Sequence, residues 1–254
     1  MKLDEIINKN YLKLNDSDLY ILKYIMNNKK ECIDIKINDL ASKCNVSRTT
    51  ILRFAQKLGF KGYSEFKAFL KWETEGKKNI ESRPVEKFYF DIQETLKSMQ
   101  QKNFTEICKL IYNAERVFVY GTGIAQALVA REMRRQFLSL QKCFYEIEGD
   151  TELKMISPSF TPKDLIIIIT LSGSREYLID LVKELNAKGI EYIAITKINN
   201  NEVAIRTKYN IYVSTSIIEL GNGNEYESMV LFSIAVEILF REYIAFLRNK
   251  EKYS

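Results

Sequence analysis

Residues 39–67, DLASKCNVSRTTILRFAQKLGFKGYSEFK, are the stretch that decides the fold of the N-terminal region. Around the start of this stretch, apolar residues recur at the spacing of one helix face, and they are Ile37, Leu40, Ala41 and Cys44. Asn45 tolerates the left-handed backbone conformation of a tight turn, and Val46 supplies an apolar residue between two helices. Ser47 is a good N-cap for a second helix. The stretch therefore predicts two short helices joined by a tight turn.

The second predicted helix has one apolar face and one face rich in hydrogen-bonding side chains. Ile51, Phe54, Ala55 and Leu58 face inward at helical spacing. The outward stripe is Thr49, Leu52, Arg53 and Gln56, with Arg48 and Lys57 beside it. Arginine can fork to guanine, glutamine can pair with adenine, and threonine or leucine can touch a thymine methyl group. This chemistry fits a helix in the major groove, although spacing alone fits a helical hairpin with a solvated basic face equally well.

Positive charge is concentrated around the same stretch. Residues 36–71 contain eight basic and two acidic residues, a net charge of +6, whereas the whole chain carries +5. Such a basic block is expected of a domain that binds the phosphate backbone of nucleic acid. Lys43, Lys61 and Lys67 are placed to contact phosphates. The residues predicted to contact DNA are Lys43, Ser47, Arg48, Thr49, Thr50, Leu52, Arg53, Gln56, Lys57 and Lys61.

The same stretch resembles the N-terminal domain of RpiR-type regulators, whose motif runs roughly DLA…VS.aTi.RF..klGf.Gy.efK. The match covers the turn and the second helix without a gap, and it continues through Phe60, Tyr63 and Lys67. The resemblance implies a helix-turn-helix domain that binds double-stranded operator DNA.

The rest of the chain predicts a second domain of a different class. Residues 1–75 have the spacing of short helices, with Asn15, Asp16 and Ser17 as candidate caps, and residues 76–86 contain Gly76 and Pro84 and predict a linker. Within residues 87–254, runs rich in strand-forming residues alternate with helical segments. The strands are expected at 116–120, 143–147, 165–170, 192–196 and, more weakly, 209–213, and the helices at 125–140, 176–188 and 225–247. This alternation predicts βαβ units and a mostly parallel sheet.

Two glycine-containing loops each follow a predicted strand and open a predicted helix. The first is Tyr120-Gly121-Thr122-Gly123-Ile124-Ala125, and the second is Thr170-Leu171-Ser172-Gly173-Ser174-Arg175. Glycines let the backbone approach an anion, and the following helix start supplies unpaired N–H groups. The first loop lacks the third glycine of a dinucleotide fingerprint, so the sequence does not favour NAD. Both loops lie at the carboxyl ends of strands, where open α/β sheets bind ligands.

Roughly residues 104–245 resemble the sugar isomerase (SIS) domain. The family pattern GxGxS corresponds to Gly121 through Ala125, and SxSGxT corresponds to Thr170 through Arg175; Thr196 and residues 201–204 also match. The resemblance implies an all-α helix-turn-helix domain followed by an α/β three-layer SIS domain, with a mostly parallel five-stranded sheet of flavodoxin-like order. The ligand-binding residues it implies are Gly121, Thr122, Gly123, Ala125, Thr170, Ser172, Gly173, Ser174 and Arg175.

Three positions in these loops depart from the family pattern. Ala125 stands where a serine hydroxyl often faces the ligand, and Thr170 replaces a serine. Arg175 stands where a phosphate-binding threonine is usual. Arg175 either grips a phosphate directly or fills the pocket and neutralises a carboxylate such as that of Glu176. Both interpretations remain open at the level of sequence.

Composition excludes several function classes. The chain has no histidine, and its four cysteines, Cys32, Cys44, Cys108 and Cys143, have no metal-ligand spacing, so no cofactor or metal site is predicted. Scattered cysteines of this kind favour reduced thiols in a cytosol. The N-terminus lacks an apolar signal core, and the apolar run 165–169 is too short to span a bilayer. We therefore expect a cytoplasmic protein without a membrane partner.

The hypothesis that unites these features is a transcription regulator of carbohydrate-metabolism genes. It would bind operator DNA as a homodimer or a dimer of dimers and respond to a phosphorylated sugar. A second hypothesis keeps the DNA binding but uses a degenerate SIS domain only for dimerisation, as Ala125 and Arg175 allow. A third is a sugar-phosphate isomerase. Without histidine its base would be a glutamate or lysine, for which Glu219 and Glu225 are unremarkable candidates.

Overall fold

A computed structural model describes residues 3–10, 13–78, 83–198 and 201–251. The chain forms two units, Met1–Val85 and Glu86–Ser254. The functional ranges predicted from sequence, 1–75 and 87–254, each fall within one unit, and their functional assignment stays a prediction. No helix in the described part of the chain combines the length and the apolar character needed to cross a bilayer.

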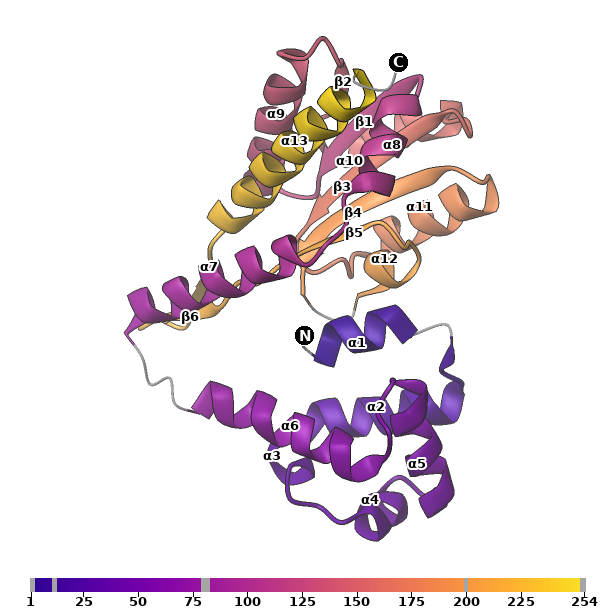
Figure 1. Ribbon diagram of the computed structural model, residues 1–254, viewed down its shortest axis with the longest axis vertical. Helices are drawn as coiled ribbons and strands as arrows, with labels where there is room; N and C mark the ends of the chain where they lie inside the picture. The colour runs from indigo at the N-terminus through magenta and orange to yellow at the C-terminus, as the bar shows by residue number, and fades with distance from the viewer. Residues whose placement is uncertain (1–2, 11–12, 79–82, 199–200, 252–254) are drawn as a thin grey trace. The chain divides into compact units, whose positions relative to one another are not determined.

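The described residues of the first unit form helices joined by short turns (Figure 1). They are α1 (Leu3–Asn10), α2 (Asp16–Asn27), α3 (Lys29–Cys32), α4 (Ile37–Lys43), α5 (Arg48–Lys57) and α6 (Tyr63–Lys78). Their apolar faces meet in one core, where the rings of Phe54 and Phe66 pack edge to face with centroids 5.7 Å apart. Asn15 is confirmed as a cap, because its side chain accepts from the N–H of Asp18 (3.0 Å) and Asp18 accepts from the N–H of Asn15 (2.9 Å).

The predicted linker 76–86 is largely helical where the structure describes it. Helix α6 continues to Lys78, and α7 (Pro84–Gln100) begins at its proline. Residues 79–82 lie outside the described residues. Gly76 costs only about 1 kcal/mol within a helix, and proline is favoured in the first turn because its missing N–H is not needed there. Gly76 and Pro84, which predicted the linker, are therefore compatible with the end of α6 and the start of α7.

The second unit is an α/β fold (Figure 1). After α7 it contains α8 (Thr105–Asn113), β1 (Arg116–Gly121), α9 (Ile124–Leu138), β2 (Phe144–Ile147), α10 (Gly149–Ile156), the 3-10 helix η2 (Ser157–Ser159), β3 (Asp164–Thr170), α11 (Glu176–Ala187), β4 (Glu191–Lys197), α12 (Glu202–Ile205), β5 (Asn210–Val213), β6 (Ile217–Leu220), β7 (Asn224–Glu227) and α13 (Val230–Glu251). The five strands expected from sequence are confirmed, and each of their bounds differs from the expected one by no more than about one residue.

Strands β1 to β5 form a parallel sheet in the order β2-β1-β3-β4-β5, which confirms the flavodoxin-like order. Side chains alternate across it: Val117 and Val119 join the core beneath α8, α9 and α13, whereas Phe118 and Tyr120 join the core beneath α10 and α11. Every residue of β3 is buried, as its unbroken apolar run indicates. The fold is therefore three-layered, and the ends of β1, β3 and β4 meet at one edge of the sheet.

The predicted single helix over 225–247 was wrong at its start. Residues 224–227 instead form β7, which pairs antiparallel with β6, and α13 begins only at Val230. Gly221 and Gly223 both have positive φ, 44° and 80°, and make the turn between the two strands. The tight turns of β-hairpins require residues with positive φ, which glycine adopts readily.

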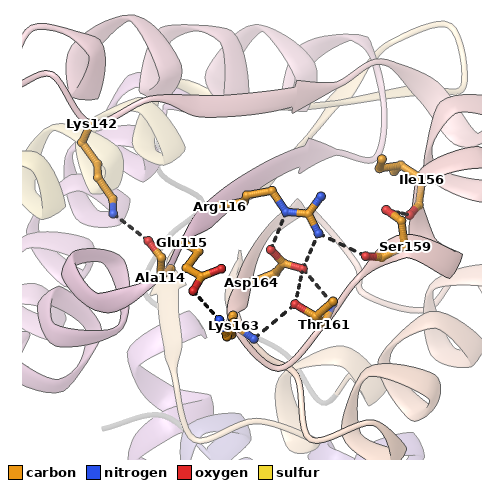
Figure 2. Close-up of polar contacts among 9 residues, drawn as sticks. All are labelled: Ala114, Glu115, Arg116, Lys142, Ile156, Ser159, Thr161, Lys163 and Asp164. Atoms are coloured by element: carbon orange, nitrogen blue, oxygen red, sulfur yellow. Dashed lines mark hydrogen bonds and ion pairs between the residues drawn. The ribbon is translucent and has the colours of Figure 1, made fainter.

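At the opposite end of the sheet from the two loops, an ion pair joins β1 to β3. Arg116 and Asp164 are register partners at the amino ends of these strands, and the guanidinium donates to both carboxylate oxygens at 2.7 Å (Figure 2). Thr161 donates to the same carboxylate through its N–H (2.7 Å) and its hydroxyl (3.0 Å). The carboxylate of Asp164 is almost fully buried and both of its oxygens accept hydrogen bonds within the protein, so this cluster stabilises the sheet.

Candidate DNA interface and ligand site

The turn between α4 and α5 has the geometry that the sequence predicts. Asn45 adopts the left-handed conformation with φ of 50°. The N–H of Val46 donates to the carbonyl of Ala41 at 2.9 Å and closes the turn. Ser47 caps α5 by accepting from the N–H of Thr50 at 3.1 Å, and the hydroxyls of Ser47 and Thr50 lie 2.9 Å apart. The two hydroxyls thus hold the start of α5 in place.

Helix α5 buries one face and exposes the residues predicted to read DNA. Ile51, Phe54 and Ala55 are fully buried in the core of the first unit. The exposed members of the predicted set on or beside this helix are Ser47, Arg48, Thr49, Leu52, Arg53 and Gln56, and Thr50 is half-buried. The structure therefore brings the predicted base-reading side chains onto one exposed helix surface.

Two lysines of the predicted set are engaged within the protein. Lys43 forms an ion pair with Glu31, which lowers the pKa of that carboxyl group. Lys57 forms an ion pair with the buried carboxylate of Asp18, so its ammonium group links α5 to α2. Lys61 is exposed, and its backbone N–H is bonded to Glu65. The ion pair of Lys57 with a buried carboxylate gives this lysine a structural role that the sequence did not indicate.

The loop between β1 and α9 is tied to the neighbouring strand. The N–H of Thr122 donates to the carbonyl of Ile169 at 3.1 Å, and Thr122 is buried. A Cβ atom on Gly121 would lie 2.4 Å from the backbone nitrogen of Ala127, so only glycine fits there. Gly123 caps α9 with an extended backbone. Ala125 is exposed in the first turn and offers only a methyl group where the family pattern has a hydroxyl.

The loop between β3 and α11 is built on Thr170. Its buried hydroxyl accepts from the hydroxyl of Thr122 (3.2 Å) and from the N–H of Gly173 (3.3 Å), so the two loops are directly joined. Ser172 and Ser174 are exposed, with their hydroxyl oxygens 2.9 Å apart. Gly173 has a φ of +61° and packs against Asn201. The structure therefore brings the predicted ligand residues of both loops together at one edge of the sheet.

Arg175 lies at the N-cap of α11 and is exposed. Among the described residues it forms no ion pair, with Glu176 or with any other carboxylate. The idea that Arg175 fills the pocket and neutralises Glu176 thus has no contact in its favour. Glu219 and Glu225, the candidate bases of an isomerase, pair across the β6–β7 hairpin, and both are exposed.

A hydrogen-bonded cluster beside these loops escaped the sequence analysis. The hydroxyl of Tyr120 donates to the carboxylate of Asp150 at 2.5 Å and lies 2.8 Å from the hydroxyl of Tyr177. Burial and the bond to Asp150 hold the pKa of Tyr120 far above its ordinary value. The one signal in the sequence was a tyrosine at the end of a buried strand, because a buried hydroxyl needs a partner.

Comparison with known proteins identifies both units. The model for the helix-turn-helix domain of the rpiR family matches residues 1–77, and the SIS domain model matches residues 110–241. The HTH-type transcriptional regulator GlvR of Bacillus subtilis (strain 168) is 44% identical over 96% of each chain.

Solved structures give the same fold. The Vibrio vulnificus NanR protein complexed with ManNAc-6P has a TM-score of 0.51 at 20% identity, over 99% of this chain and 97% of that one. The sugar isomerase domain of an RpiR transcription factor from Sphaerobacter thermophilus has a TM-score of 0.53 at 21% identity, over 66% of this chain and 98% of that one. The identity to GlvR and the two matching family models show that the chain belongs to the RpiR family of helix-turn-helix transcriptional regulators and carries a SIS domain.

Proposed function

We propose that this regulator controls carbohydrate-metabolism genes: its first unit binds operator DNA, and a phosphorylated sugar bound by its SIS domain changes that binding. The observation that carries the proposal is the start of α11. There Arg175, two serine hydroxyls and the first backbone N–H groups of a helix gather at the carboxyl edge of a parallel sheet.

The electrostatics at the start of α11 favour an anion. The aligned peptide dipoles place partial positive charge at a helix N-terminus, where a cationic side chain is normally unfavourable. Arg175 nevertheless lies there without an ion pair among the described residues. A phosphate there could accept hydrogen bonds from the guanidinium, from the first backbone N–H groups of the helix and from the serine hydroxyls of the loop. We therefore place the phosphate of the effector at residues 172–175.

The sugar would extend from this loop towards the first one. The hydroxyls of Thr122 and Thr170 join the two loops, so a ligand held by one loop is also positioned by the other. NanR, which shares the fold, was solved with ManNAc-6P, a phosphorylated amino sugar. That likeness supports a phosphorylated sugar as the class of effector.

The DNA half of the proposal rests on the exposed face of α5. Arg53 and Gln56 are exposed there and carry the donors and acceptors that base edges require. Two copies of this helix, in a homodimer or a dimer of dimers, would meet the two halves of a palindromic operator. The effector alters transcription only if it binds the DNA-competent and DNA-incompetent arrangements with different affinity.

A second candidate is a SIS domain that serves only as a dimerisation scaffold. Its support is the start of α9, where Ala125 replaces the family's serine and Ile124 and Leu128 are 88% and 59% exposed. Exposed apolar side chains on one helix are typical of a surface that another protein covers.

Thermal-shift measurements on the full chain separate the two candidates. We expect one sugar phosphate to raise the melting temperature by several degrees, because a ligand at 100 times its Kd adds about 2.7 kcal/mol, and its unphosphorylated sugar to have no effect. Arg175→Ala should abolish the shift, whereas Arg134→Ala, which removes an exposed arginine from α9, should preserve it. No shift with any sugar phosphate would favour the scaffold.

The link to DNA is tested with a binding site obtained by selection from random-sequence DNA. Fluorescence anisotropy then measures the affinity of the protein for that site with and without the active sugar phosphate. A change in affinity that Arg175→Ala removes is the expected result. An affinity that is the same with and without the sugar phosphate would contradict the proposed control.

A further inference from the structure

The Tyr120–Asp150–Tyr177 cluster joins three elements that surround the ligand loops. Tyr120 is the last residue before the Gly121 loop, Asp150 lies in the first turn of α10 after β2, and Tyr177 lies two residues after Arg175. Because β2, β1 and β3 are neighbouring parallel strands, their carboxyl ends meet at one edge of the sheet. The cluster therefore lies at the same edge as the two loops.

One bond of the cluster has a direction that chemistry fixes. An ionised carboxylate only accepts, so the hydroxyl of Tyr120 donates to Asp150. The hydroxyl of Tyr177 lies 2.8 Å from that of Tyr120 and also interacts with the carboxylate of Asp150. Both tyrosine hydroxyls therefore hold the carboxylate of Asp150.

Asp150 accepts from the hydroxyl of Tyr120 through Oδ1, and the hydroxyl of Tyr177 also interacts with this carboxylate. Asp150 is half-buried, whereas Tyr120 is fully buried. The charge-assisted bond from Tyr120 thus holds the carboxylate in a fixed orientation. A carboxylate can accept about four hydrogen bonds, so the two tyrosines leave acceptor capacity for a ligand. A rigid, partly desolvated carboxylate can accept hydrogen bonds from neighbouring hydroxyl groups, which are the groups that a sugar carries.

The charges around the cluster give a bound sugar phosphate a direction. Arg175 lies at the N-cap of α11, two residues before Tyr177, so its positive charge is on the side of the cluster away from α10 in the chain. Burial is the main cause of the raised pKa of Tyr177, and the positive charge of Arg175 acts to lower it. The negative charge of Asp150 disfavours a phosphate beside it and favours hydroxyl groups. The phosphate end and the hydroxyl end of a ligand would therefore occupy different parts of the site.

We propose that Asp150 is a specificity-determining residue that accepts hydrogen bonds from the hydroxyl groups of the sugar phosphate, and that Tyr120 and Tyr177 are the positioning residues that hold it. This inference rests on the proposed function, because it assigns the sugar end of the site whose phosphate end is residues 172–175. It also explains why a charged group is kept beside an otherwise apolar core of Phe118, Ile147 and Leu178.

The test compares two probes on the full chain: inorganic phosphate, and the sugar phosphate that raises the melting temperature of the unsubstituted protein most. Thermal-shift titrations give the affinity for each. Asp150→Asn keeps the size of the side chain but weakens its acceptor, so we expect it to weaken sugar-phosphate binding by about tenfold or more. Its affinity for inorganic phosphate should stay within about twofold of the starting value, since that probe has no sugar hydroxyl groups.

Two further variants complete the design. Tyr177→Phe removes only the hydroxyl group that contacts Tyr120 and Asp150, and we expect a loss in the same direction, smaller than that of Asp150→Asn and again confined to the sugar phosphate. Asp180→Asn is the matched control, because Asp180 is an exposed aspartate on α11 whose one ion pair with a described residue is with Lys183 at 3.4 Å. It should leave both affinities unchanged.

The outcomes separate this inference from the function on which it rests. Equal weakening of both probes by Asp150→Asn would mean that the cluster only braces the fold, and unchanged binding of both would mean that Asp150 does not touch the sugar; either result overturns the inference alone. If no sugar phosphate binds the unsubstituted protein, the proposed function fails and the inference fails with it. Should Asp150→Asn not fold, Tyr177→Phe decides by the same comparison.

Discussion

The side-chain oxygen of Asn201 occupies the space that a Cβ atom on Gly173 would need, with only 2.2 Å between them. Asn201 is itself fixed, since its oxygen accepts from the N–H of Ala204 at 2.8 Å and thereby caps α12. Its amide also lies 3.4 Å from the hydroxyl of Thr196 at the end of β4. The ligand loop after β3 and the segment after β4 therefore hold each other in place.

We predict that Gly173→Ala removes sugar-phosphate binding and destabilises the protein by more than conformational strain alone. An L-residue in the left-handed region costs roughly 1–2 kcal/mol, and here Asn201 must also move. Gly189→Ala is the matched control, because Gly189 has a φ of +67° and no atom within 4 Å of its Cβ position. Urea unfolding should show a loss of about 1 kcal/mol for the control and a larger one for Gly173→Ala. Equal losses would mean that the contact with Asn201 has no energetic effect.

Removing Arg53 should weaken operator binding. Arg53 is exposed on the face of α5 that carries the predicted base-reading residues, and a side chain that reads a base is worth about 1–3 kcal/mol. Fluorescence anisotropy at fixed salt concentration should therefore report an affinity lower by about fivefold or more for Arg53→Ala. Arg134→Ala, the same charge change in the second unit, should have little effect. If both variants bind equally, Arg53 does not belong to the reading set.

Features encoded by local patterns were predictable from the sequence. Short apolar runs predicted the buried strands. The spacing of Ile51, Phe54 and Ala55 predicted which face of α5 is buried. The hairpin of β6 and β7 was missed because its exposed residues have no apolar alternation, although the Gly221-Asn222-Gly223 turn was a usable signal.

Pairings between distant residues were not predictable in the same way. Tyr120 lies 30 residues from Asp150 and 57 from Tyr177, and Lys57 lies 39 from Asp18. A single sequence does not indicate which lysine on a predicted exposed helix face will form an ion pair with a buried carboxylate. Such contacts emerge only when the elements are packed, so the composition of the site was predictable but its internal bonding was not.

Lys57 should prove important for stability. Its ammonium group pairs with Asp18, whose carboxylate is 3% exposed, so removing it leaves a buried charge with fewer partners. We expect Lys57→Met, which keeps the aliphatic stem, to lower the free energy of unfolding by about 1–3 kcal/mol. A double-mutant cycle with Asp18→Asn measures the pair itself, and a coupling energy of about 1 kcal/mol is expected. Purely additive effects would show that the two side chains do not interact in solution.

The Arg116–Asp164 pair should make the stability of the protein depend on acid pH. Burial acts to raise the pKa of Asp164, but the hydrogen bonds from Arg116 and Thr161 outweigh it and hold that pKa below its ordinary value of 3.8. A carboxyl group whose pKa is lowered by folding stabilises the native state above its unfolded pKa and loses that contribution as pH falls through the folded pKa. Asp164→Asn should therefore be less stable than the unsubstituted protein by about 1–3 kcal/mol at pH 7, with the difference shrinking below about pH 4. Urea unfolding of both proteins between pH 7 and pH 3 measures this, and a difference that does not change with pH would mean that the ionised carboxylate is not the source of the stability.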